Sequence, residues 1–257
     1  MPEQPADLTA RHAVTGDAVL DGRVRLSQPP GGYRAAIDPI LLAAAVPAGD
    51  EDRVADLGCG VGTAALCLAA RVAGCRIVGL DLQDDLVDLA LANVQANGWA
   101  DRITAVSGNV AGPPRDTLPA GGFTRVMANP PYLDPGRHRE PPLRSKALAM
   151  IGDGTPLDQW VATGHRLLAP RGWFILIHRA DCMTEVLASV ATRFGGIELI
   201  PIFPALGKPA CRIIVRARRD VRTPPAILPG LTLHADNGAF TAEAEGVLRD
   251  ACALAGA

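Results

Sequence analysis

The chain has 257 residues, a formal net charge of −2 at pH 7, 48% hydrophobic residues and only 4% aromatic residues. This near-neutral charge argues against a strongly basic, nonspecific nucleic-acid binder, and the aliphatic composition is typical of a soluble α/β protein. The longest smooth apolar run, residues 40–46, is too short to cross a membrane, and the first residues lack the features of a secretion signal, so we expect a cytoplasmic protein.

The first functional signal in chain order is a glycine turn that follows a predicted strand at residues 54–57. Its sequence, Gly58-Cys59-Gly60-Val61-Gly62, lets the backbone turn sharply and approach a ligand closely. The G-x-G-x-G spacing departs from the pyrophosphate fingerprint. The acid before it, Asp56, would repel phosphates and suits an ammonium group instead. The turn therefore predicts a nucleotide-type loop whose ligand carries an ammonium group rather than a pyrophosphate at this position.

Strands and helices alternate along the rest of the chain. We predict helices over residues 63–72, 84–97, 157–168 and 181–194, and strands over residues 76–80, 103–106, 123–128, 172–178, 197–203 and 211–217. This alternation favours one α/β unit with a small N-terminal extension, and the last two strands should close the sheet edge as an antiparallel pair. Asp81 follows the second strand near the offset of a ribose-binding acid, and Asn109 follows the third, where it could bond an adenine edge.

A base-holding motif, Asn129-Pro130-Pro131-Tyr132, follows the strand at residues 123–128. An exocyclic amine is a poor nucleophile because its lone pair is delocalised, so an enzyme must pull the nitrogen toward tetrahedral geometry. The Asn129 oxygen and the Pro130 carbonyl can each accept one amine hydrogen, while the prolines stiffen the turn. Tyr132 can stack on the ring, and no ionised base is required. The alternative is a strand-ending turn, since Asn and Pro dominate turns for local reasons.

These motifs, in this order, resemble the class I S-adenosylmethionine-dependent methyltransferases, and the last motif resembles their amino-methylating branch. The resemblance implies a Rossmann-like α/β fold with a seven-stranded, mostly parallel sheet and helices on both faces. It implies S-adenosyl-L-methionine as cofactor and Asn129, Pro130, Pro131 and Tyr132 as catalytic residues. The family often has Asp at the position of Asn109. The residues that the resemblance assigns to the cofactor are Asp38, Asp56, Gly58, Cys59, Gly60, Gly62, Asp81, Leu82, Asn109 and Asn129.

The N-terminal residues 22–44 look like the leading segment of bacterial tRNA adenine-N6 methyltransferases, which modify adenine 37 beside the anticodon of a valine tRNA. The resemblance spans most of the chain. It implies an extension over the cofactor and substrate site at residues 1–36 and a methyltransferase domain at residues 37–257. Asp38 would then contact the cofactor. Because Pro39 follows it, Asp38 is equally well read as a helix N-cap, and both readings stay open.

Positive charge follows the base-holding motif in the loop at residues 133–146, which is where an RNA backbone would need it. The predicted RNA contacts are Arg137, Arg139, Arg144 and Lys146. The alternative is a solvated surface loop. A second basic group at residues 212–222 is as readily an ordinary charged strand end.

Two other functions stay open. One is methylation of a glutamine amide in a translation release factor, although such enzymes usually carry a helical N-terminal domain where this chain looks extended. The other is a noncatalytic RNA-binding relative. The six cysteines show no zinc spacing, so we expect reduced thiols and no metal. The expected partner is tRNA, no membrane is expected, and the chain is either a monomer or a homodimer.

Overall fold

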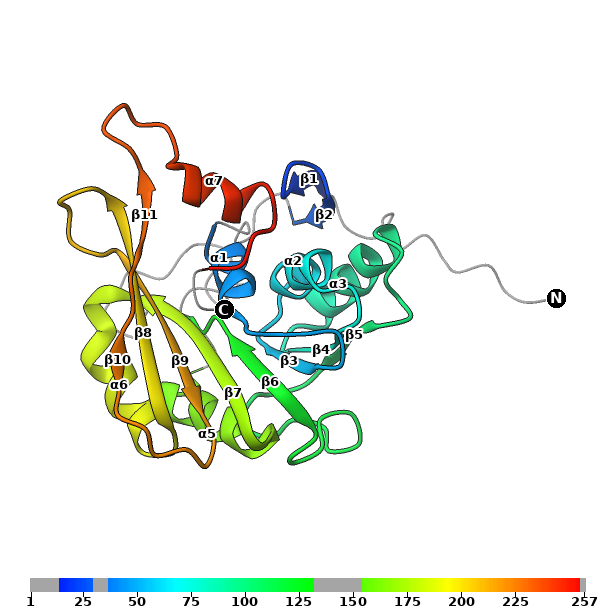
Figure 1. The fold of residues 1–257 in the computed structure, drawn as a ribbon. Helices are drawn as coiled ribbons and strands as arrows, with labels where there is room; N and C mark the ends of the chain where they lie inside the picture. The colour runs from blue at the N-terminus through cyan, green and yellow to red at the C-terminus, as the bar shows by residue number, and fades with distance from the viewer. Residues whose placement is uncertain (1–13, 30–36, 132–153, 255–257) are drawn as a thin grey trace.

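The structure, a computed structural model, describes residues 14–29, 37–131 and 154–254. Its centre is one large sheet whose strand pairings are parallel except for those made by β9 (Figure 1). The strands lie in the order β10 (Ala226–Ile227), β8 (Gly195–Ala205), β9 (Arg212–Arg218), β7 (Leu168–Arg179), β6 (Phe123–Ala128), β3 (Arg53–Leu57), β4 (Arg76–Asp81) and β5 (Ile103–Ser107). The seven expected strands are therefore present.

Two short strands extend this sheet beyond the expected seven. Both β10 and β11 (Leu231–His234) pair in parallel with the outer side of β8, one after the other along its length. The antiparallel partner of β8 is β9, which lies between β8 and β7. The predicted antiparallel pair is thus confirmed, but β9 is an interior strand and the short strands cover the outer side of β8.

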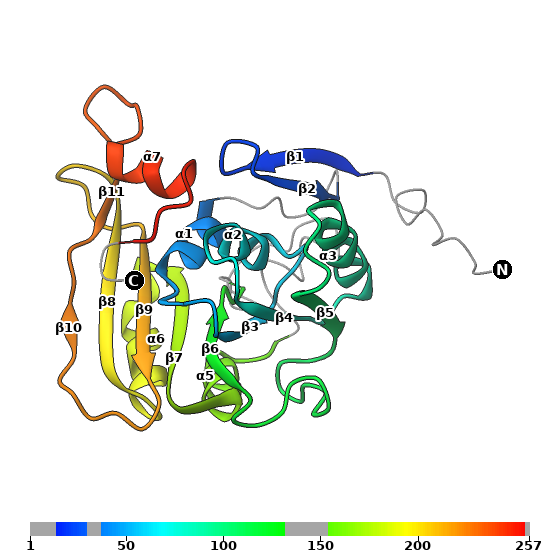
Figure 2. The same ribbon diagram turned by 45° about the vertical axis from the view of Figure 1, so that its right-hand side comes forward.

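Helices cover both faces of the sheet (Figures 1 and 2). One face carries α1 (Ile37–Ala45), α2 (Thr63–Arg71), α3 (Asp84–Ala96) and α7 (Ala242–Leu248). The other carries α5 (Leu157–Leu167) and α6 (Met183–Ala191). The helix expected over residues 181–194 is shorter, because a 3-10 turn (Ala180–Cys182) precedes α6 and the chain must turn into β8 after it.

The central strands are buried on both faces, which explains their nearly continuous apolar sequences. On β6, Met127 packs against the cluster under α1 and α2, whereas Val126 and Ala128 pack against the cluster under α5 and α6. Successive side chains of a strand point to opposite faces, so one run of apolar residues fills both clusters. Ile175 and Phe174 divide in the same way on β7.

The N-terminal residues form a β-hairpin of β1 (Thr15–Val19) and β2 (Val24–Gln28), which lies beside α3 in Figure 2. Asn93 of α3 and Asn97, which follows the last residue of that helix, hold it. Asn93 accepts a hydrogen bond from the Ser27 N–H at 2.7 Å and donates to the Ser27 carbonyl at 3.1 Å. Asn97 makes the same pair of bonds with Arg25, at 3.0 and 2.8 Å. The helix therefore presents side-chain amides where a sheet would present another strand.

Asn93 also reaches the glycine turn, because its amide donates to the Val61 carbonyl at 3.0 Å and its side chain is 1% exposed. We expect Asn93→Leu to lower the free energy of unfolding by about 2–4 kcal/mol, since buried backbone groups of the hairpin and the turn lose their partner. Urea unfolding measures this loss. Asn97→Leu is the matched control, because it removes the hairpin bonds and one bond to the Asn93 carbonyl but leaves the glycine turn bonded, and it should cost less. Equal losses in the two variants would contradict the assignment.

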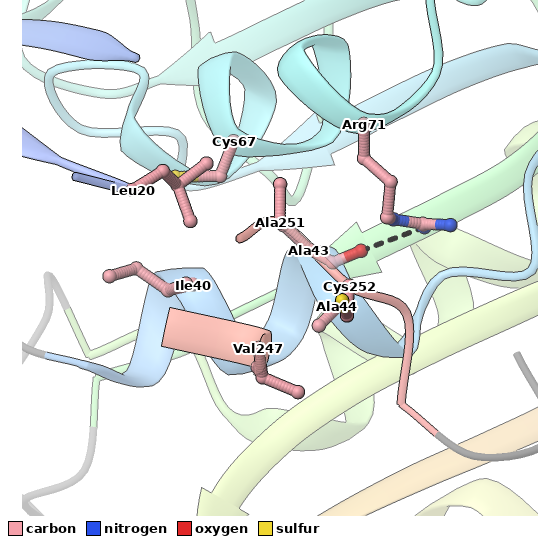
Figure 3. Close-up of a pocket in the computed structure, with 9 residues that line it drawn as sticks. All are labelled: Leu20, Ile40, Ala43, Ala44, Cys67, Arg71, Val247, Ala251 and Cys252. Carbon is pink, nitrogen blue, oxygen red and sulfur yellow. Dashed lines mark hydrogen bonds between the residues drawn. The ribbon is translucent and has the colours of Figure 1, made fainter. Parts of the chain in front are cut away.

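Helix α1 is held at its C-terminal end by residues distant in sequence. Arg71 of α2 donates to the carbonyls of Ala43 and Val46, and the Leu254 N–H donates to the Ala44 carbonyl at 2.9 Å. Donors at a helix C-terminus satisfy its last carbonyls. Figure 3 shows Arg71 at the small pocket where α1, α2 and the C-terminal segment meet. This junction explains how the C-terminal segment supports the N-terminal part of the domain.

Candidate active site at the carboxyl edge of the sheet

The sheet register brings the predicted site residues to one edge. Leu57 pairs with Ala128 on one side and with Leu80 on the other, so the glycine turn, Asp81 and Asn129 lie where neighbouring strands end, at the same level. Asp81 in turn pairs with Ser107, which precedes the segment containing Asn109. Neighbouring strands lie about 4.8 Å apart, so these four segments form one continuous rim. Ligands of open α/β sheets bind at this edge.

The glycine turn has the backbone that only glycine adopts easily. The φ angles of Gly58, Gly60 and Gly62 are 70°, 55° and 84°, in the left-handed region. The N–H groups of Gly58 and Cys59 both donate to the Leu80 carbonyl, at 2.7 and 3.0 Å, which fastens the turn to β4. A Cβ on Gly60 would meet no atom of the described residues within 4 Å. Among the described residues, the turn therefore leaves open space beside Gly60.

Cys59 can offer a ligand only its backbone, because its thiol is directed into the protein. The Sγ atom lies 2.7 Å from the position that a Cβ on Gly79 would occupy, which explains the glycine in β4. Burial, followed by the charges of Asp56 and Asp81, raises the pKa of the Cys59 thiol well above its usual value. A neutral, buried thiol is neither a nucleophile nor a metal ligand.

Asp56 is the most perturbed acid of the site. Burial, followed by the negative charge of Asp81, raises its pKa to about 8, and a hydrogen bond from the Ala65 N–H opposes this rise. Its Oδ2 atom is buried and has no hydrogen-bond partner among the described residues. A buried carboxylate oxygen of this kind costs free energy unless a donor or a positive charge approaches it. The position fits a ligand ammonium group.

Asp81 braces the glycine turn. Its Oδ2 atom accepts a hydrogen bond from the Gly60 N–H at 2.8 Å, and its Oδ1 atom accepts one from the Gln83 N–H at 3.0 Å. Burial raises its pKa, and these backbone hydrogen bonds oppose the rise. Each carboxylate oxygen keeps further lone pairs, so the bracing leaves room for ribose hydroxyls. Beside it, Leu82 is unusually exposed for a leucine, at 44%.

Asn109 lies on the same rim and is half-buried. Its Oδ1 atom accepts a hydrogen bond from the Ala111 N–H at 2.7 Å, which forms a local Asx turn. The sequence predicts that this oxygen also accepts from an adenine amine. The Asx turn fixes the direction of the Asn109 side chain, and its role toward the adenine stays a prediction.

The base-holding motif begins directly after β6. Asn129 is half-buried, Pro130 is buried and Pro131 is half-buried. Since Ala128 pairs with Leu57, Asn129 and Gly58 are neighbours across two adjacent strands. The rest of the predicted acceptor and RNA-binding set lies outside the described residues: Tyr132, Arg137, Arg139, Arg144 and Lys146.

Asp38 lies in the first turn of α1, with its carboxylate 3.0 Å from the Arg212 Nε atom and its side chain 4% exposed. This ion pair joins α1 to the start of β9, and the contact between Asp38 and the cofactor stays a prediction. Arg212 belongs to the second basic group of the sequence, which the fold divides. Arg216, 2% exposed, bonds Glu198 at 2.8 Å, and Arg218 lies at the opposite end of β9. The group is therefore not one surface.

Two residues of α5, which no sequence motif identifies, contact the rim. The Trp160 ring packs on Gly58, and the Thr163 hydroxyl donates to the Val110 carbonyl at 2.8 Å. Neither residue stands in a recognisable motif. Asn93, by contrast, could have been identified from the sequence, because it is an amide on the otherwise apolar face of α3.

Residues 14–29, 37–131 and 154–254 contain no cluster of three or more His, Cys, Asp or Glu side chains placed to hold a metal ion. Within those ranges, no helix is long and apolar enough to span a membrane.

Known proteins are similar to this chain in sequence and in fold. The family described as "Methyltransferase small domain" matches residues 36–149. A tRNA1(Val) (adenine(37)-N6)-methyltransferase of Aeromonas hydrophila subsp. hydrophila is 31% identical over 186 residues, which are 72% of this chain and 76% of that protein. A protein of the same name from Porphyromonas gingivalis is 29% identical over 175 residues, covering 66% of this chain and 68% of the relative.

A solved structure extends the likeness to three dimensions. A predicted O-methyltransferase from Agrobacterium tumefaciens has a TM-score of 0.71 and 26% identity, over 84% of this chain and 98% of that one. The sheet order, the glycine turn and the acid that braces it are thus found in a chain that aligns with methyltransferases over most of its length. This chain belongs to the methyltransferase family whose curated members are named tRNA1(Val) (adenine(37)-N6)-methyltransferase.

Proposed function

We propose that this protein transfers a methyl group from S-adenosyl-L-methionine to the exocyclic N6 amine of an adenine in tRNA, with adenine 37 beside the anticodon as the target. The observation that carries the proposal is the register between β3 and β6, which makes Gly58 and Asn129 neighbours. A loop suited to a methyl donor and a loop suited to a planar amine therefore share one rim. The names of the curated relatives supply the tRNA.

The rim offers a suitable group for each part of the donor. The open backbone at Gly60 and the buried Oδ2 atom of Asp56 suit the methionine part, whose ammonium would partner that oxygen. Asp81 would bind the ribose, and the exposed Leu82 and the oriented amide of Asn109 suit the adenine. When bound, the donor would supply an electrophilic methyl group, whose C–S bond breaks as the C–N bond forms, leaving S-adenosylhomocysteine.

The acceptor residues act by geometry. Asn129 and the Pro130 carbonyl each accept one hydrogen of the amine, which directs its nitrogen lone pair toward the methyl group. The amine loses a proton to solvent after the new C–N bond forms, so no ionised side chain is needed. Tyr132 stacks on the flipped base, and Arg137, Arg139, Arg144 and Lys146 bind the flanking phosphates. Because tRNA is the substrate, we place the reaction in the cytoplasm.

The decisive experiment uses bulk tRNA from cells that lack this gene. Purified protein is incubated with this tRNA and methyl-labelled S-adenosyl-L-methionine, and the digested nucleosides are analysed by mass spectrometry. We expect label in N6-methyladenosine, and mapping of the labelled fragment should place it at position 37.

A parallel incubation with release factor distinguishes the main alternative. The same acceptor geometry suits a planar glutamine amide, so label in the protein and none in tRNA would replace the adenine with a glutamine side chain. Label in neither substrate, with S-adenosylhomocysteine still bound in calorimetry, would refute both acceptors.

A further inference from the structure

Helix α5 approaches the sheet unusually closely. A Cβ on Gly164 would lie 2.4 Å from the Phe174 ring of β7, so only glycine permits this packing. Trp160 lies one turn earlier on the same helix and is 7% exposed. The Cη2 and Cζ3 atoms of its ring lie 2.8 and 3.0 Å from the position of a Cβ on Gly58. The close approach of α5 therefore places an aromatic edge directly against the first glycine of the cofactor turn.

The next turn of α5 holds a second cofactor segment. A threonine inside a helix commonly bonds a carbonyl of its own preceding turn. The Thr163 hydroxyl instead donates to the Val110 carbonyl, 53 residues away in the chain, and the side chain is 2% exposed. Val110 follows Asn109, whose Asx turn with Ala111 is described above. Two hydrogen bonds thus fix the backbone at residues 109–111.

We propose that Trp160 and Thr163 are positioning residues for the methyl donor, Trp160 acting through Gly58 and Thr163 acting through the backbone at Asn109 and Val110. Both lie on the face of the sheet opposite α2 and α3. The glycine turn is bonded to β4 on one side, and α5 supplies the packing on the other. One rigid helix thereby sets the spacing between the methionine end and the adenine end of the cofactor site. This inference rests on the proposed use of S-adenosyl-L-methionine.

The first test separates positioning from stability. Thr163→Val keeps the shape of the side chain and removes the donor, whereas Thr163→Ser keeps the donor. We expect calorimetry to show S-adenosylhomocysteine binding about five- to tenfold more weakly in Thr163→Val and within about twofold of wild type in Thr163→Ser. Val161→Ala is the matched control, because Val161 is fully buried on α5 and contacts the core instead. This control should lower the melting temperature and leave the affinity unchanged.

The second test reads Trp160 directly. A variant carrying Trp99→Phe and Trp173→Phe leaves Trp160 as its single tryptophan. We expect its fluorescence to change on titration with S-adenosylhomocysteine, saturating at the dissociation constant found by calorimetry. A companion that keeps only Trp173 should show no change.

Unchanged affinity in Thr163→Val together with an unresponsive Trp160 would overturn the inference. No RNA is present in either test, so a wrong acceptor would leave both results intact. Failure of the wild-type protein to bind S-adenosylhomocysteine would refute the cofactor itself.

Discussion

Asn129→Ala is expected to lower kcat for adenine methylation by about 100- to 1,000-fold, because one preorganised hydrogen-bond acceptor of the amine is lost. Asn129 follows β6, and the glycine turn follows the neighbouring strand β3. The loss should therefore appear in the transfer step and not in donor binding. Initial rates with labelled donor and tRNA measure the first quantity, and calorimetry with S-adenosylhomocysteine measures the second.

Asn129→Asp is the matched comparison for that variant. It keeps side-chain oxygens in a similar position but adds a negative charge. We therefore expect its kcat to lie between those of Asn129→Ala and the wild-type protein. Because the mechanism uses acceptor geometry and no ionised base, the alanine variant should show the same pH dependence of kcat as the wild-type protein. Undiminished turnover by Asn129→Ala would refute the acceptor role.

Asp56→Asn is expected to weaken binding of the methyl donor and to change how the free protein responds to pH. Burial raises the pKa of Asp56 from 3.8 to about 8, so the folded protein binds a proton there that the unfolded chain has already lost. The free energy of unfolding of the ligand-free protein should therefore fall as pH rises from about 4 to about 8. The full shift corresponds to a loss on the order of 5 kcal/mol. Burial also raises the pKa of Asp81, so this carboxyl contributes to the same fall in the free energy of unfolding as pH rises.

Asp56→Asn removes both the free-energy cost of ionising the buried carboxyl and the carboxylate that would pair with the ligand ammonium. At pH 8.5 we expect ligand-free Asp56→Asn to melt at a higher temperature than the wild-type protein, whereas the two should converge near pH 5. S-adenosylhomocysteine should bind the variant about 100-fold more weakly, because the buried charge that would meet its ammonium is gone. Thermal melts across pH, with and without ligand, measure both effects. Equal ligand affinity in both proteins would contradict the assignment of Asp56 to the ammonium.

Exchange of protons on binding gives an independent measurement. Below about pH 8 the free carboxyl is mostly protonated, and pairing with an ammonium would favour its ionised form. Calorimetry in buffers of different ionisation enthalpy should then detect proton release by the wild-type protein at pH 7. Asp56→Asn should release none from this position.

The sequence by itself determined the α/β class, most strand positions and the composition of the rim. Local signals carry this information: a strand followed by Gly58-Cys59-Gly60, an acid at Asp81, and Asn129 after an apolar run. In a parallel sheet the carboxyl ends of all strands face one edge, so residues that follow different strands meet there without any knowledge of strand order. The roles of these residues remain predictions that the experiments above address.

Only the tertiary structure decided which strands are neighbours and what supports the rim. The pairing of β3 with β6, the hydrogen bonds of Asn93 to the hairpin and the packing of Trp160 on Gly58 all join segments far apart in the chain. Such contacts depend on the close packing of complementary surfaces, which leaves no local periodicity in the sequence. The tertiary structure also separates Arg212 from Arg218. These residues are near in sequence, but β9 is extended and carries them to opposite edges of the sheet.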